Sequence, residues 1–277
     1  MSVLLHGEPD IITAKIVSMA PSELLKGRCA LITGGTSGIG FAIAKAFLNA
    51  GASVVITGRS RQRLDKAVAA LGCGGRVYSF VMDNTKPETF RPTFDKMLEK
   101  VKGEGIRCID ILVNNAGVLG ASMPNATEEA YDAVLDTNLK GVFFLSQMMG
   151  RYMVDNKIKG NILNIASSSS LRPAFSAYTL SKWGIRGLTL GLAKALVQYG
   201  ITVNGVAPGP TATPMLIKDG NKNLINKIPL GRYVLPEEIA NMAVFLVSGM
   251  GRAIIGDIVY MTGGAGVIGF DDMRYSF

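Results

Sequence analysis

Short runs of apolar residues alternate along this chain with longer segments in which apolar residues recur at helical spacing. This alternation is typical of βαβ units packed into a parallel sheet. The pattern predicts seven strands, at 29–33, 53–57, 76–82, 109–113, 161–165, 202–206 and 258–261. It predicts helices at 39–50, 61–71, 86–102, 128–154, from Tyr178 to about Tyr199, and at 236–248. We expect an α/β fold, a single Rossmann-type doubly wound domain whose seven-stranded parallel sheet is flanked by helices.

Length and composition favour one large domain. With 277 residues, 48% hydrophobic content and 18% charged residues, the chain can bury a full core, and no low-complexity tract or linker divides it. We expect a catalytic domain at 27–265 with a substrate loop at about 209–233, an N-terminal extension at 1–26 and a C-terminal tail at 266–277. The extension contains three acidic residues and broken apolar runs, so it matches neither a signal peptide nor a membrane span.

Charge and residue usage limit the chemistry. The net charge of +8 comes from dispersed Lys and Arg residues, which suits a phosphorylated cofactor better than nucleic acid or a membrane surface. Ordinary surface composition explains this charge equally well. His6 is the only histidine, and the three cysteines form no CxxC pair. These counts argue against a Ser-His-Asp hydrolase, a metal site and a disulfide framework, and they favour a cytoplasmic location.

A glycine-rich turn follows the first predicted strand and opens the first helix. Glycines at this junction let the backbone approach a pyrophosphate, while the free N–H groups and the positive end of the helix hold its charge. The strand, turn and helix occur in the order of a dinucleotide-binding motif. The residues of this turn expected to bind the cofactor are Gly34, Thr36, Ser37, Gly38, Ile39 and Gly40.

Arg59 follows the second predicted strand, at the position where an acidic residue would bind the ribose hydroxyls of NAD. Its planar guanidinium can instead pair with a ribose 2′-phosphate. The sequence therefore predicts NADP(H), with NAD(H) less favoured. The alternative is that Arg59 only begins a solvated helix with Arg61 and Arg63.

Tyr178 and Lys182 lie four residues apart at the start of a predicted helix, so their side chains share one helix face. A tyrosine, with a reference pKa of about 10, can exchange protons near neutrality if a nearby cation stabilises the phenolate. The pair therefore indicates acid–base chemistry. The same spacing also occurs where a half-buried ring simply lies under a solvated amine.

Together these motifs resemble the classical short-chain dehydrogenase/reductase family over about residues 26–265. The resemblance rests on the glycine turn and the Tyr/Lys pair, and also on Asp83-Asn84, Asn114-Asn115-Ala116-Gly117, Asn138, a serine cluster before Tyr178, and Pro208-Gly209. It implies a homotetrameric or homodimeric reductase that moves a hydride between nicotinamide and a carbonyl or alcohol carbon.

The resemblance also implies residue roles. Asp83 and Asn84 would meet the adenine, and Asn115, Ala116 and Gly117 would support the sheet and the adenosine ribose. Asn138 would bend its helix and hold a water linked to Lys182, which itself would bind the nicotinamide ribose with Tyr178. The nicotinamide amide would meet Pro208, Gly209, Thr211 and Thr213. Strand-end turns, a packing residue and a plain loop are the simpler interpretations of these residues.

The catalytic serine lies among four adjacent serines, 167–170. Alignment from Asn164-Ile165 selects Ser167, and Ser169 would be a second hydroxyl at the substrate. In the expected mechanism NADPH delivers hydride to the carbonyl carbon, Ser167 holds the oxygen, and Tyr178 protonates it.

Apolar residues on the segments expected to wall the pocket suggest a bulky apolar ketone, with Phe175 and Met215 binding it beside Ser169; the others are Leu119, Met123, Leu216 and Ile217. A 3-oxoacyl-[acyl-carrier-protein] reductase is an alternative, since residues 134–147 and the basic balance resemble that subfamily, but the two terminal segments extend beyond its usual form. A non-catalytic NADP(H)-binding sensor is an alternative of another class. An epimerase or dehydratase would need a larger C-terminal domain.

Overall fold

A parallel sheet of seven strands forms the centre of the computed structural model, which describes residues 23–72, 74–217, 224 and 227–266. The strand order is β3-β2-β1-β4-β5-β6-β7, and every paired strand runs parallel to its neighbour. The strands are β1 (Cys29–Thr33), β2 (Ser53–Gly58), β3 (Val77–Val81), β4 (Ile111–Asn114), β5 (Asn161–Ile165), β6 (Thr202–Pro208) and β7 (Ile258–Met261). The predicted seven-stranded doubly wound fold is confirmed.

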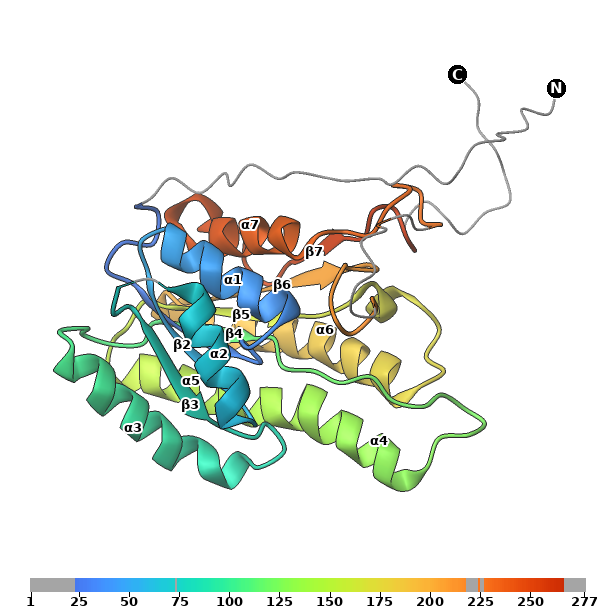
Figure 1. Ribbon diagram of the computed structural model, residues 1–277, viewed down its shortest axis with the longest axis horizontal. Helices are drawn as coiled ribbons and strands as arrows, with labels where there is room; N and C mark the ends of the chain where they lie inside the picture. Colours follow the sequence, from blue (N-terminus) through green and yellow to red (C-terminus); the bar gives the residue numbers. More distant parts are fainter. Residues whose placement is uncertain (1–22, 73, 218–223, 225–226, 267–277) are drawn as a thin grey trace, which may run out of the picture.

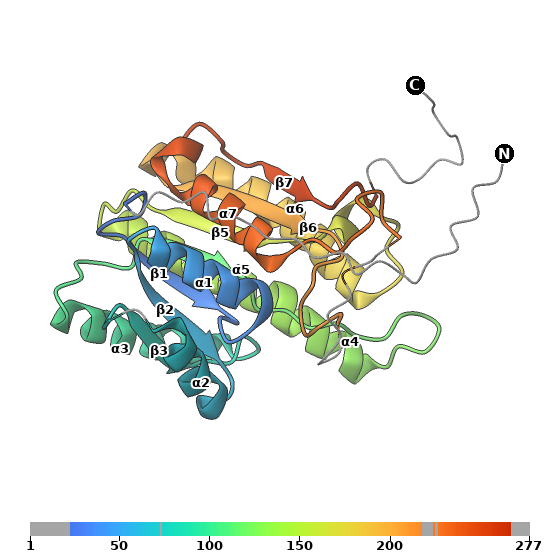
Figure 2. The same cartoon turned by 45° about the horizontal axis from the view of Figure 1, so that its top comes forward.

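Helices cover both faces of this sheet (Figures 1 and 2). The helices are α1 (Gly38–Asn49), α2 (Arg61–Leu71), α3 (Phe90–Gly103), α4 (Glu128–Leu135), α5 (Gly141–Asp155), α6 (Ala177–Leu196) and α7 (Pro236–Val247). In β1, Ala30 and Ile32 pack with α1, α2 and α7, whereas Cys29 and Leu31 pack with α3, α5 and α6. Successive residues of a strand point to opposite faces, so a sheet buried on both sides needs continuous apolar runs.

Two predicted helices are built differently from the prediction. The segment predicted as one helix at 128–154 is interrupted between α4 and α5 by a π-helical turn, Asp136–Lys140. The helix predicted at 86–102 begins with a 3₁₀ turn, Pro87–Thr89, and continues as α3. The strand predicted at 109–113 is displaced, because β4 pairs with β1 only from Ile111.

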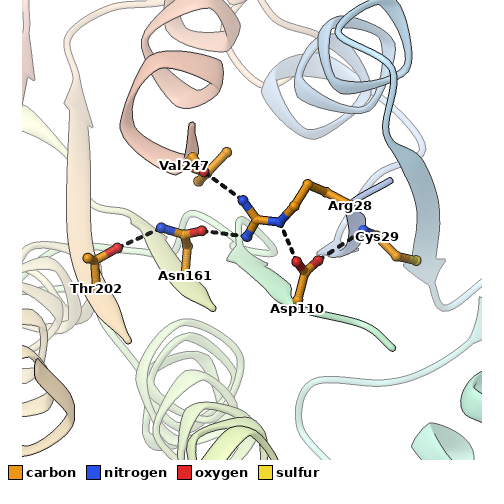
Figure 3. Close-up of polar contacts among 6 residues, drawn as sticks. All are labelled: Arg28, Cys29, Asp110, Asn161, Thr202 and Val247. Carbon is orange, nitrogen blue, oxygen red and sulfur yellow. Dashed lines mark hydrogen bonds and ion pairs between the residues drawn. The ribbon is translucent and has the colours of Figure 1, made fainter. Parts of the chain in front are cut away.

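Polar side chains join the strands at their amino ends (Figure 3). The Arg28 guanidinium pairs with Asp110 through Nε and donates to Asn161 Oδ1 at 2.7 Å and to the Val247 carbonyl at 3.1 Å. Asn161 Nδ2 donates in turn to Thr202 Oγ1 at 2.6 Å. Since Val247 ends α7, the guanidinium also satisfies a carbonyl that the helix leaves without a partner.

The predicted terminal segments lie largely outside the described residues, at 1–22 and 267–277, as does part of the predicted substrate loop, at 218–223 and 225–226. The boundaries of the extension, loop and tail stay predictions.

The strand order reverses between β1 and β4, because the chain builds outward through β2 and β3 before returning to the centre. In open α/β sheets such a reversal leaves a crevice outside the carboxyl ends of the strands, where ligands bind. The predicted site residues follow the carboxyl ends of β1, β2, β3, β4, β5 and β6, so this topology brings them together.

Candidate active site

A cleft of about 690 Å³ runs across the carboxyl ends of the strands. It is lined by almost every residue predicted to bind the cofactor: Gly34, Thr36, Ser37, Gly38, Ile39, Arg59, Asp83, Asn84, Asn115, Ala116, Gly117, Tyr178, Lys182, Pro208, Gly209, Thr211 and Thr213. Ser167, Ser169 and Met215 also line it, whereas Gly40, Asn138 and Phe175 do not. Residues from the glycine turn after β1 through to the loop after β6 therefore converge on one cavity.

The glycine turn is packed too closely for side chains. A Cβ on Gly40 would lie 2.3 Å from Asn115 Nδ2 and 2.5 Å from the Gly34 carbonyl oxygen. Gly34 has a φ of +65°, and a Cβ there would lie 3.0 Å from the Ala116 Cα. Gly40 thus acts by close packing behind the turn, without lining the cleft.

Asn115 fastens this turn to the end of β4. Its Nδ2 donates to the carbonyls of Thr33 and Gly34 at 2.9 and 3.1 Å, and its backbone N–H donates to Thr33 Oγ1 at 3.1 Å. Ala116 N–H donates to the same hydroxyl at 3.0 Å. The role in supporting the sheet that the family resemblance implied for Asn115 has a direct geometric basis.

The N-terminus of α1 faces the cleft with donors available to an anion. Ser37 occupies the N-cap position in extended conformation, but its side chain makes no capping hydrogen bond to the helix. The first N–H groups of a helix lack partners within the helix and carry a partial positive charge. A pyrophosphate bound here would satisfy them.

Basic and amide groups line the end of the cleft near β2 and β3. Arg59 is exposed, and Arg63, one turn farther along, donates from Nη2 to Ser37 Oγ at 3.4 Å. Asn84 is 4% exposed, and its Nδ2 has no hydrogen-bond partner among the described residues. Asp83 Oδ1 accepts from the backbone and hydroxyl of Thr85. Arg63 was missed as a site residue, because its bond to Ser37 joins the first turn of α2 to the turn after β1, which only the fold brings together.

Asn138 lies in the π-helical turn and is 1% exposed. Its Oδ1 accepts from the Val118 N–H at 2.8 Å, and its Nδ2 donates to the Val118 carbonyl at 2.9 Å and to Ser181 Oγ at 3.3 Å. The predicted distortion of the helix at Asn138 is therefore present. Its side chain ties the segment after β4 to α6, which carries Tyr178 and Lys182.

Ser167 and Tyr178 are close enough for their side chains to hydrogen-bond. Burial raises the pKa of the Tyr178 phenol above its ordinary value, and the hydrogen bond with Ser167 lowers that pKa in part. Among the neighbouring serines, Ser170 is buried and bonded to the Ser167 carbonyl and the Tyr260 hydroxyl. This geometry favours Ser167 as the hydroxyl that works with Tyr178.

Lys182 is buried beside Tyr178. Its Nζ lies 5.6 Å from the centre of the Tyr178 ring and donates to the Ile165 carbonyl at 2.8 Å. Burial lowers the pKa of Lys182 to about 8, because a charged ammonium loses its hydration there. The expected lowering of the Tyr178 pKa by a nearby cation is not the net effect in the protein, where the loss of hydration dominates for both groups.

The loop after β6 folds against the glycine turn. A Cβ on Gly209 would lie 2.5 Å from the Thr262 carbonyl oxygen, and a Cβ on Gly38 would lie 3.3 Å from Thr213 Cγ2. Thr211 Oγ1 donates to the Gly209 carbonyl at 2.9 Å. These contacts hold Pro208, Gly209 and the two threonines in the wall of the cleft that Tyr178 and Lys182 also line.

Apolar and polar side chains from the segments after β4, β5 and β6 line the cleft together with Ser167. Leu119, Met215 and Leu216 line it with Ser169 and Arg172. Phe175, predicted to bind substrate, is 59% exposed and does not line the cleft. The structure therefore does not support that prediction, and Phe175 lies next to an antiparallel bridge between residues 122 and 176. Met123 and Ile217 also do not line the cleft, and Arg172 was missed because nothing in its local sequence marks it.

The residues of the cleft fit a dinucleotide. The uncapped N-terminus of α1, the glycines that leave no room for a Cβ, and the unpartnered Asn84 amide are the features that such a ligand would use. The fold and this site define a dinucleotide-binding α/β protein with a Tyr/Lys pair beside the cofactor cleft.

Comparison with known proteins gives the family. The short chain dehydrogenase family model matches residues 28–223. The chain belongs to this family of oxidoreductases, whose members use a nicotinamide cofactor, and the resemblance seen in the sequence is confirmed.

Relatives within the family have different substrates. The chain is 37% identical to the 3-oxoacyl-[acyl-carrier-protein] reductase FabG of Thermotoga maritima, over 87% of this chain and 98% of that protein. It is 38% identical to a 3alpha-hydroxysteroid dehydrogenase of Mediterraneibacter gnavus, over 87% and 98%. A Burkholderia cenocepacia short chain dehydrogenase in complex with NADP is 34% identical, with a TM-score of 0.77 over 88% and 99% of the two chains.

Among the described residues, no group of three or more His, Cys, Asp or Glu side chains could hold a metal ion. No helix in the described part of the chain is both long enough and apolar enough to cross a bilayer.

Proposed function

We propose that this protein is an NADP(H)-dependent oxidoreductase that interconverts a bulky apolar ketone and its secondary alcohol. The observation that carries the proposal is the grouping of the Ser167 hydroxyl, the Tyr178 phenol and the buried Lys182 ammonium in the cleft that also holds the glycine turn. This grouping supplies a hydrogen-bond donor, a proton donor and a cation at one point beside a dinucleotide site.

When bound, the nicotinamide cofactor supplies the hydride. Ser167 donates a hydrogen bond to the carbonyl oxygen, where negative charge grows during reduction. Tyr178 transfers its phenolic proton to that oxygen. Because burial raises the pKa of Tyr178, the phenol stays protonated at neutral pH, which is the form that reduction requires.

Lys182 and Asn138 prepare Tyr178 for this step. The Lys182 ammonium, held by the Ile165 carbonyl, stabilises the phenolate that remains after proton transfer. We assign it a second role in binding the nicotinamide ribose. We assign Asn138 a positioning role, because its side chain joins Val118 to Ser181. It would hold in place the helix segment through which a water returns the proton to Tyr178.

The preference for NADP(H) rests on Arg59 and Arg63. Both line the cleft at the end of β2, where a 2′-phosphate would lie. Asp83 is the only carboxylate among the described lining residues, and two groups of Thr85 already donate to its Oδ1. Binding of NADP by one similar structure agrees with this assignment.

A second candidate is 3-oxoacyl-[acyl-carrier-protein] reduction, favoured by the 37% identity to the Thermotoga maritima enzyme and by the net charge of +8, which suits an acidic carrier.

Association into dimers or tetramers is also proposed. Large apolar side chains are exposed on α5 and α6, including Phe143, Phe144, Trp183 and Leu190. Light scattering of the purified protein measures that state directly.

Turnover of a panel of carbonyl compounds with NADPH and NADH, followed by absorbance, tests the function. The panel contains apolar ketones, a steroid ketone and a 3-oxoacyl thioester. We expect NADPH-dependent reduction that Tyr178→Phe abolishes while its NADPH affinity stays unchanged. Tight NADPH binding without turnover of any carbonyl would favour a cofactor sensor and refute the proposal.

A further inference from the structure

Arg172 is a cation that lines the cleft and that the proposed mechanism does not use. It lies five residues after Ser167 in the chain, and we call this part of the cleft the substrate end. Arg172 follows the 3₁₀ turn Ser168–Leu171. Its N–H donates to the Ser169 carbonyl at 3.1 Å, and its own carbonyl accepts from Trp183 Nε1 at 2.8 Å. The backbone of Arg172 is therefore held from two sides, on the same wall of the cleft as Ser167.

The guanidinium of Arg172 lacks a partner within the described chain. Its Nε is buried and finds no hydrogen-bond acceptor among the described residues, and no carboxylate of the described chain forms an ion pair with it. Folded proteins satisfy nearly all buried donors, because an unmet donor loses its hydration without compensation. A guanidinium also keeps its charge at any physiological pH. An unmet, charged donor in a binding cleft is a group prepared for an anion.

The other charged groups of the cleft have different positions or partners. Arg59 and Arg63 lie at the opposite end, after β2. Lys182 donates to Ile165 and lies beside Tyr178. No carboxylate among the described lining residues stands near the substrate end, since Asp83 follows β3. The substrate end therefore carries uncompensated positive charge.

We propose that Arg172 binds a carboxylate of the substrate, so that the substrate is a ketone with an apolar body and a carboxylate group. This inference rests on the proposed function and narrows its substrate class. A 3₁₀ turn rises roughly 2 Å per residue, so Arg172 lies about 10 Å along the chain from Ser167. A substrate can thus place its carbonyl at Ser167 and its carboxylate at Arg172, with its body against Leu119, Met215 and Leu216.

The guanidinium suits this task because its planar fork matches the two oxygens of a carboxylate. The contact lies away from the reacting carbon, so it would be equally strong before and during hydride transfer. Such binding lowers KM and leaves kcat unchanged. Arg172 is therefore a specificity residue, and its removal has a kinetic signature different from that of Tyr178.

The test uses straight-chain decanoic acids that carry one ketone, placed in turn at each carbon between the carboxyl group and the terminal methyl group, and the methyl ester of each. The wild-type protein, Arg172→Gln and Arg172→Lys are assayed with NADPH. Arg91→Gln is the matched control, since it removes one positive charge from an exposed ion pair on α3. Calorimetric titration of each acid into the NADP⁺-saturated proteins measures binding independently of turnover.

We expect the wild-type protein to prefer at least one acid over its ester by about 10- to 100-fold in kcat/KM, as charge-assisted hydrogen bonds allow. In Arg172→Gln this preference is lost through a higher KM for the acid, while the activity on the ester is kept. Arg172→Lys keeps part of the preference for the acid, and Arg91→Gln keeps all of it. Equal loss on acid and ester, or no acid bound more tightly by the wild-type protein than by Arg172→Gln, would overturn the inference. Reduction of the esters alone leaves the proposed function intact but overturns the inference, whereas failure to reduce any ketone in either panel counts against both.

Discussion

Gly40→Ala tests the packing behind the glycine turn. The added methyl would lie 2.3 Å from Asn115 Nδ2 and 2.5 Å from the Gly34 carbonyl oxygen. Since the second atom belongs to the backbone, a side-chain rotation alone cannot make room. The N-terminus of α1 must therefore move away from the turn after β1, and Asn115 loses its hydrogen bonds to the carbonyls of Thr33 and Gly34.

The size of the effect follows from these contacts. Overpacking costs roughly 1–3 kcal/mol, and two lost hydrogen bonds cost about 1 kcal/mol each. The better helix propensity of Ala returns up to about 1 kcal/mol. The net loss is about 2–5 kcal/mol, which lowers the apparent Tm of a domain of this size by roughly 4–20 °C. We also expect weaker NADPH binding, because the turn to which we assign the pyrophosphate loses its anchor.

Gly103→Ala is the matched control, because Gly103 ends α3 in open space, with no positive φ and with no atom within 4 Å of the place that its Cβ would take. Thermal unfolding and fluorescence titration with NADPH, applied to both variants, give the comparison. The control should melt at or slightly above the wild-type temperature and bind NADPH normally. A Gly40→Ala protein with wild-type Tm and NADPH affinity would refute this account of the turn.

Three further predictions concern charge. Reduction should fall about tenfold per pH unit above pH 8, because Lys182, with a pKa of about 8, loses its charge there while the raised pKa keeps Tyr178 protonated; a flat rate profile from pH 7 to 10 would contradict it. Asp110→Ala should cost about 2–4 kcal/mol in chemical denaturation, because it leaves Arg28 without its ion-pair partner in a half-buried site, whereas Asp95→Ala in an exposed pair should cost under about 1 kcal/mol. Arg59→Ala should lower kcat/KM for NADPH by about 10- to 100-fold and change that for NADH less than about threefold; equal loss with both cofactors would remove the 2′-phosphate assignment.

The sequence predicted the sheet well because both of its faces are covered. Strands such as Ser53–Gly58 are buried along almost their whole length and bounded by turn residues, so their positions needed no knowledge of their partners. The glycine turn and the Tyr178/Lys182 spacing were likewise predictable, since each depends on geometry within a few residues of chain.

What the sequence did not reveal depends on contacts between distant segments. The π-helical turn arises where Asn138 bonds to Val118, 20 residues away. The pKa of Tyr178 rises because of burial, which no spacing shows. Arg172 differs from other surface arginines only because its Nε is enclosed by the folded chain without an acceptor among the described residues.

The Arg28 network sits at one rim of the sheet and the cleft at the other, separated by strands that are about 15 Å long. Substitutions more than about 10 Å apart with no shared partner have nearly additive effects on stability. Substitutions around Arg172 and Met215 that change the substrate preference should therefore have effects on stability that add to those of stabilising substitutions around Arg28. This separation gives the chain evolvability, because new specificities can accumulate at one rim while the other keeps the strands joined.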